Sequence, residues 1–144
     1  MLNLLNLVKE TVKEIKGIGD VDVELLGEKK IKIDFDKHNS YDEMQLVNAF
    51  EKLMNVKELY NVKLYKTDII VDEDGFLHNK GPVTYIDEWD EEAEILLPEW
   101  LISVLEHILT DNKNMEGYKL ELFYETDTGV ETVEVFVTTV YNLF

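Results

Sequence analysis

The stretch YKLELFYETDTGVETVEVFVT, residues 118–138, decides the fold class. Along its first half, polar residues alternate with the apolar residues Tyr118, Leu120, Leu122 and Tyr124. After the turn residues at 126–129, the alternation resumes with Val133, Val135 and Val137. Because successive side chains of a strand point to opposite faces of a sheet, this pattern predicts a β-hairpin with one buried face.

Two earlier segments also have the character of hairpins, and a helical pattern precedes each hairpin. Residues 21–35 alternate on both sides of a turn, and residues 60–86 contain short apolar runs, among them Tyr60, Val62 and Leu64, around the Asp74-Gly75 turn. Apolar residues recur at helical spacing in residues 3–16, 40–54 and about 98–111. We therefore predict a single α+β domain over residues 1–144, an antiparallel sheet of three hairpin regions with about three helices on one face, and the element order α-ββ-α-ββ-α-ββ.

The charge of the chain is strongly negative and unevenly distributed. Thirty-one acids face fourteen bases, all of them lysine, which gives a net charge of -17. Residues 1–66 have a net charge of -1, whereas residues 67–144 have a net charge of -16. Since affinity for phosphate backbones comes from clustered lysine and arginine, we expect no direct binding of nucleic acid and no binding to anionic membranes. A basic protein is the partner that this charge favours.

No motif in the chain indicates a reaction, so we expect a protein that is not an enzyme, with no catalytic residue, cofactor or metal site. Cysteine is absent, which excludes thiolate nucleophiles and zinc-thiolate sites. Asp72-Glu73-Asp74-Gly75 resembles part of an EF-hand, but ligand residues are missing at the required spacing, and a hairpin turn is the better interpretation. His107 and Asp111 stand at helical spacing for a metal, a pairing that is common by chance on polar helix faces.

One acidic stretch stands out as a candidate interaction site. Residues 85–100, YIDEWDEEAEILLPEW, contain seven acids, no base and both tryptophans of the chain. A helix dipole stabilises only acids near the first turn, so it does not account for this crowding. A tryptophan among charges is either folded back onto the core or offered as an anchor for a partner. The predicted partner-binding residues are Asp87, Glu88, Trp89, Asp90, Glu91, Glu92 and Glu94.

These features suggest an acidic inhibitor of a basic, nucleic-acid-acting protein, including the type that imitates the charge of DNA. By class analogy, small acidic α+β proteins include nuclease inhibitors, immunity proteins and phage anti-defence proteins. The alternative is an assembly module in which the C-terminal hairpin pairs with another copy and the charge serves solubility. The chain shows no signal peptide and no membrane span, so we expect it in the cytoplasm.

Overall fold

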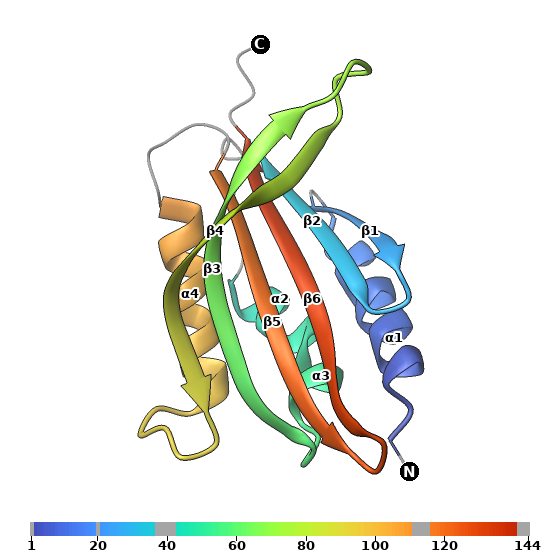
Figure 1. The fold of residues 1–144 in the computed structure, drawn as a ribbon, viewed down its shortest axis with the longest axis vertical. Coiled ribbons are helices and arrows are strands. Elements are labelled where there is room, and N and C mark those ends of the chain that lie inside the picture. Colours follow the sequence, from blue (N-terminus) through green and yellow to red (C-terminus); the bar gives the residue numbers. More distant parts are fainter. Residues whose placement is uncertain (1, 20, 37–42, 111–115, 141–144) are drawn as a thin grey trace.

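The protein folds around one curled, six-stranded mixed sheet, seen in a computed structural model that describes residues 2–19, 21–36, 43–110 and 116–140 (Figure 1). The strand order across the sheet is β1-β2-β6-β5-β3-β4. The strands are β1 (Val21–Gly27), β2 (Lys30–Asp36), β3 (Leu59–Val71), β4 (Leu77–Asp90), β5 (Glu116–Thr126) and β6 (Gly129–Val140). β1 and β4 therefore form the two edges of the sheet.

The four helices of the described residues cover the same face of the sheet, and in this part of the chain no helix covers the other face (Figure 1). They are α1 (Leu4–Lys16), α2 (Glu43–Ala49), α3 (Glu51–Met54) and α4 (Leu97–Thr110). One continuous core lies between helices and sheet, and the apolar sides of residues 118–138 form its centre, because Tyr118, Leu122 and Val135 are each at most 1% exposed. The predicted hairpin and its buried face are confirmed.

The prediction of an entirely antiparallel sheet is wrong. β6 pairs with β5 in antiparallel fashion, but it pairs with β2 in parallel, with Ile31 opposite Val135 and Ile33 opposite Val137. The alternation of a strand defines its two faces but does not say which strand becomes its neighbour. Here the third hairpin lies between the first and the second, which places β6 beside β2, and the two strands run in the same direction.

The second predicted helix is interrupted. We expected one helix over residues 40–54, whereas α2 ends at Ala49 and α3 begins at Glu51. At the interruption, Phe50 N donates to both Leu46 O and Val47 O, at 3.2 and 3.1 Å, which tightens the last turn of α2. Phe50 and Leu53, on either side of the start of α3, are both buried. The predicted cap residue Ser40 lies outside the described residues.

The second hairpin region is much longer than its sequence predicts. β3 and β4 have 13 and 14 residues, and β4 extends through Asp90 instead of ending near Ile86. The turn at Asp74-Gly75 is confirmed, with Asp72 N donating to Phe76 O at 2.9 Å and Gly75 at a φ of 87°. The acidic residues 87–90 are therefore part of an edge strand and not of a loop before α4.

The far end of this hairpin, residues 68–80, forms an arm that crosses the helix-free face (Figure 1). Pairing of β3 with β5 ends at Thr67 opposite Gly117, while pairing of β3 with β4 continues to Val71 opposite Leu77. Asn79 fastens the arm to the sheet: its Nδ2 donates to Thr67 Oγ1 at 2.9 Å, and its Oδ1 accepts from Thr138 Oγ1 at 3.0 Å. The arm thus reaches β6 across β5.

Candidate functional site

The predicted acidic stretch is divided between the two faces of the sheet. Asp87 is turned toward the helices, where its Oδ2 accepts a hydrogen bond from Trp100 Nε1 at 3.1 Å. Trp89 packs partly against the core, and its Nε1 donates to Ile95 O at 2.9 Å. Both residues attach α4 and its preceding loop to β4. Trp89 is therefore the folded-back kind of tryptophan and not an exposed anchor.

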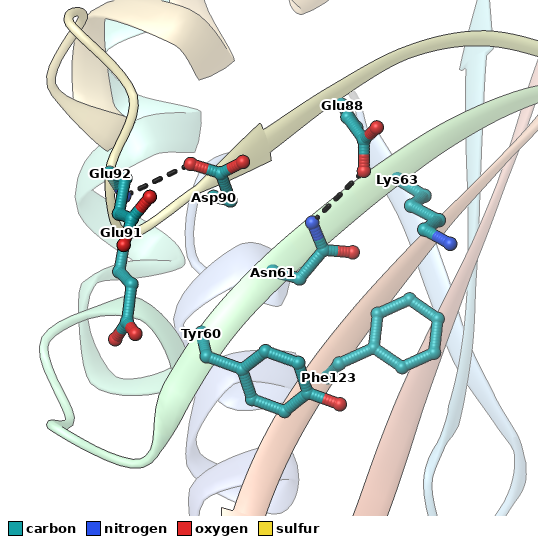
Figure 2. A pocket seen from close by; sticks show the side chains of 8 residues that line it. All are labelled: Tyr60, Asn61, Lys63, Glu88, Asp90, Glu91, Glu92 and Phe123. Carbon is teal, nitrogen blue, oxygen red and sulfur yellow. Dashed lines mark hydrogen bonds between the residues drawn. The ribbon is translucent and has the colours of Figure 1, made fainter.

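Four other predicted residues come together on the opposite, helix-free face. Glu88 and Asp90 from β4, with Glu91 and Glu92 from the loop that follows, line a shallow pocket of about 420 Å³ (Figure 2). Tyr60, Asn61, Lys63 and Phe123 complete its lining from β3 and β5. We call these eight residues the acidic pocket. Glu94, the remaining predicted residue, is exposed in the loop and does not line it.

Short polar contacts hold the acidic side of the pocket in place. Asn61 Nδ2 donates to Glu88 Oε2 at 3.1 Å and to Trp89 O at 3.0 Å (Figure 2). Glu92 N donates to Asp90 Oδ1 at 3.0 Å, and Glu91 N donates to Tyr60 O at 3.2 Å. The start of the loop is therefore anchored to β3, so the carboxylates are presented from an ordered backbone.

The charge of the pocket is largely uncompensated. Lys63 is its one lysine against four acids. Among the described residues, no lysine nitrogen lies within 4.0 Å of a carboxylate of Asp90, Glu91 or Glu92. The segments at the two edges of the sheet differ in net charge. Residues 77–110, which contain the edge strand β4, carry eight acids and one lysine, whereas residues 4–36, which contain the edge strand β1, carry eight acids and six lysines. The β4 edge is thus the strongly negative edge of the sheet.

Aromatic rings form the other side of the pocket. The centroids of Tyr60 and Phe123 are 6.4 Å apart, and the ring planes are inclined by 45°. Lys63 Nζ lies 5.4 Å from the centroid of Phe123. Close by on β4, partial desolvation and the negative charge of the neighbouring Glu88 carboxylate raise the pKa of Tyr85. Carboxylates beside aromatic faces suit the binding of a cation.

Sequence reasoning missed the aromatic half of this pocket. Tyr60 alternates with Val62 and Leu64, which predicts a place in the core, and these two residues are indeed at most 1% exposed. A register shift between Leu59 and Asn61 breaks that alternation, and Tyr60 instead lines the pocket beside Phe123. The available signal was Phe123 itself, an aromatic residue on the polar side of a strand that alternates cleanly.

A second polar cluster lies under the tip of the hairpin arm. A cavity of about 400 Å³ is lined there by Asp22, Val23, Glu24, Lys32, Asp34, Gly75 and Phe76. The Lys32 side chain is 8% exposed, and its Nζ lies 3.7 Å from Glu24 Oε1 and 3.9 Å from Asp34 Oδ2. Asp34 Oδ1 is buried without a hydrogen-bond partner among the described residues. Burial raises the pKa of Asp34, and the nearby Lys32 ammonium partly offsets this.

This cluster gives a pH-dependent prediction. Replacing Lys32 with methionine is expected to raise the pKa of Asp34 further above the ordinary aspartate range, because the opposing positive charge is removed while the carboxyl stays buried. Since a raised folded-state pKa disfavours the ionised form, the added destabilisation should be absent at acid pH and grow as pH rises through that pKa. Carboxyl ¹³C NMR titration of both proteins measures the shift. An unchanged or lowered pKa in the variant would contradict the assigned cause.

The histidines form no cluster in the described part of the chain. His78 Nε2 lies 2.8 Å from Asp72 Oδ2 in the arm, and this contact together with backbone donors lowers the pKa of Asp72. The His107 ring meets Tyr118 edge-on, with centroids 5.9 Å apart. Asp111, its candidate metal-binding partner, and His38 lie outside the described residues. Within the described ranges, no group of three or more acidic or histidine side chains is arranged to hold a metal ion.

Comparisons with known proteins do not place the chain in a family. No family model and no curated protein matches it. One similar solved structure is the truncated neck and C-terminal motor homology domain of ViK1 from Candida glabrata, which is 11% identical with a TM-score of 0.33. The match covers 76% of this chain and 45% of that one. None of the described helices is both long enough and apolar enough to cross a membrane.

Proposed function

We propose that the protein is a non-catalytic inhibitor that binds a basic, nucleic-acid-acting partner protein through the acidic pocket. The observation that carries the proposal is the convergence of Glu88, Asp90, Glu91 and Glu92 around one open pocket beside two aromatic rings. Carboxylates without a lysine of the described residues within 4.0 Å attract a positively charged surface and accelerate docking. Aromatic side chains next to them supply apolar contact area, which the binding of a protein surface requires.

The arrangement of the acids narrows the kind of recognition. Imitation of duplex DNA needs a long row of evenly spaced charges on one surface. Here the acids form a compact group at one corner of the sheet, while Asp87 is bonded to Trp100 on the helix side. The proposal is therefore that this corner binds individual basic side chains of the partner. The bound inhibitor would then block the cleft in which the partner otherwise holds nucleic acid.

Self-association through the C-terminal hairpin is supported less well. β5 lies between β6 and β3, and β6 lies between β2 and β5, so both strands already have two neighbours. The free edges of the sheet belong to β1 and β4, and β4 carries Asp87, Glu88 and Asp90, charges of the kind that discourage edge-to-edge pairing. Pairing with another copy would have to use side chains of this hairpin and not its backbone.

Neutralising three acids of the pocket tests the proposal. The triple variant Asp90→Asn, Glu91→Gln, Glu92→Gln is expected to bind the partner at least about tenfold more weakly, because three uncompensated charges are removed from the contact surface. A matched control, Glu73→Gln, Glu106→Gln, Asp127→Asn, makes the same change in net charge at exposed positions outside the pocket. The control should bind like the wild type.

The partner is first recovered from a native lysate at low salt with the wild-type protein as bait. Its Kd is then measured for the three proteins at several salt concentrations, and its activity on nucleic acid is measured as wild-type protein is added. Equal affinities of the triple variant and its control would refute the acidic pocket as the contact site. A recovered partner whose activity is unchanged would refute inhibition.

A further inference from the structure

The Tyr60 and Phe123 rings form a cation seat on a rigid part of the molecule. Phe123 belongs to β5, an interior strand, and pairs with Asn61 of β3 in the sheet register. Tyr60 O accepts the hydrogen bond from Glu91 N, so its backbone is fixed to the acidic loop. Both side chains are only partly buried, because they lie on the face of the sheet opposite the core. The seat is thus an aromatic surface left open beside four carboxylates.

A cation of the protein itself already uses this seat. Lys63 lies between Glu88 of β4 and Glu121 of β5 in the sheet register, so carboxylates flank it on both sides. Even so, among the described residues no carboxylate oxygen lies within 4.0 Å of Lys63 Nζ, and the ammonium instead sits 5.4 Å from the centroid of Phe123 (Figure 2). The geometry of the fold therefore favours a positive charge over this ring.

The chemistry of the seat fits a guanidinium group better than an ammonium group. A guanidinium is planar and weakly hydrated, so it stacks on aromatic rings and donates in a fork to carboxylates. Glu88 is held by Asn61 at Oε2, so its carboxylate is oriented before a ligand arrives, while Asp90, Glu91 and Glu92 supply further acceptors around the pocket. This chain contains no arginine, so such a group would come from a partner.

We propose that the seat receives an arginine side chain of the partner, and that Lys63 occupies its place in the free protein. The inference rests on the proposed function, since it names the group by which the basic partner is recognised. On binding, the guanidinium replaces the Lys63 ammonium over the Phe123 ring. It also forms hydrogen bonds with the carboxylates of the pocket, which the Lys63 ammonium does not reach. Lys63 thus weakens the site for cations that cannot form the additional hydrogen bonds.

Short peptides test the seat independently of any natural partner. Three peptides of alternating serine and a variable residue are titrated into the protein, the variable residue being arginine, lysine or citrulline, which has the shape of arginine without its charge. The arginine peptide is expected to shift the ring resonances of Tyr60 and Phe123 in NMR spectra and to bind at least about fivefold more tightly than the lysine peptide. The citrulline peptide should cause no saturable shift. Equal binding of the arginine and lysine peptides would overturn the preference for arginine.

Two substitutions separate the seat from the general negative charge. Phe123→Leu keeps an apolar side chain and the net charge, and it should weaken arginine-peptide binding at least about fivefold. Lys63→Gln should strengthen binding about threefold or more, whereas Lys57→Gln, which makes the same charge change at an exposed position outside the pocket, should not. Thermal unfolding of each variant shows whether it is folded, and Tyr60→Leu replaces Phe123→Leu if the latter is not.

The outcomes distinguish this inference from the proposed function. If Phe123→Leu binds the arginine peptide like the wild type, or if both lysine variants strengthen binding equally, the seat is overturned, while the acidic pocket can still bind the partner. If the peptides behave as expected but neutralising Asp90, Glu91 and Glu92 leaves partner affinity unchanged, the proposed function is overturned, and the seat is an arginine-binding site that this partner does not use.

Discussion

Gly117→Val is expected to destabilise the protein by about 3 kcal/mol, because the new side chain would overlap the crossing point of the hairpin arm. A Cβ at this position would lie 2.6 Å from Thr67 Oγ1, 2.9 Å from Asn79 Nδ2 and 2.9 Å from Ile69 Cγ1. Two of these three atoms are held in place by hydrogen bonds. Asn79 Nδ2 and Thr67 Oγ1 are bonded to each other, and Asn79 also reaches Tyr118 O at 3.3 Å and Thr138 Oγ1 at 3.0 Å.

The overlap must be relieved by moving the arm away from the sheet. That movement breaks the hydrogen bonds of Asn79 and leaves buried partners such as Thr67 and Thr138 without them, which adds to the steric cost. Valine has a higher propensity for strands than glycine, so propensity alone would stabilise β5. The expected loss of stability therefore comes from the steric overlap. The crossing of the arm is therefore the reason for glycine at this position.

Urea unfolding followed by circular dichroism measures the effect. Gly27→Val in β1 is a matched control, because the nearest atoms to a Cβ there belong to the Lys30 side chain at 3.8 and 3.9 Å, which is ordinary contact. The control is expected to change the unfolding free energy by less than about 0.5 kcal/mol, as at most surface positions. A Gly117→Val protein as stable as this control would show that the arm does not cross at Gly117.

Trp100→Ala is expected to destabilise the protein by about 4 kcal/mol, in the range typical of removing a large buried aromatic side chain. Trp100 is 5% exposed and lies in the first two turns of α4, which it packs against the sheet. Its Nε1 also donates to Oδ2 of the exposed Asp87 at 3.1 Å, so the substitution also removes a hydrogen bond between α4 and β4. Both losses weaken the attachment of α4 to β4.

Two further substitutions divide this effect into its parts. Trp100→Phe keeps most of the ring and removes the donor, so it should cost only about 1 to 2 kcal/mol, because Asp87 is exposed and water can replace the lost donor. Trp89→Ala should cost less than Trp100→Ala, because Trp89 is only partly buried and belongs to the periphery of the core. Urea unfolding by circular dichroism avoids reliance on the fluorescence of either tryptophan. A Trp89→Ala variant less stable than Trp100→Ala would reverse the structural roles given to the two residues.

Part of the candidate site follows from sequence. Residues 87–92 are identifiable as an unusual concentration of acids, and four of them do line one pocket. Their partners are not identifiable in this way, because Tyr60, Asn61 and Lys63 reach the pocket from β3 and Phe123 reaches it from β5. It also could not be predicted that Asp87 faces the helices and Glu88 the pocket, because this stretch was assigned to a loop. Once β4 extends through it, neighbouring residues must point to opposite faces.

The sequence by itself determined the order of helices and hairpins, the buried side of residues 118–138 and the concentration of negative charge after residue 66, but not the break after Ala49 or the length of β4. These properties depend on local periodicity and composition, which neighbouring residues carry. Only the tertiary structure decided that β6 pairs in parallel with β2, that residues 68–80 cross the helix-free face, and that Tyr60 leaves the core side of β3. Strand pairing joins residues far apart in the chain, and a shift of one residue in register exchanges the two faces, so periodicity within one strand cannot specify either.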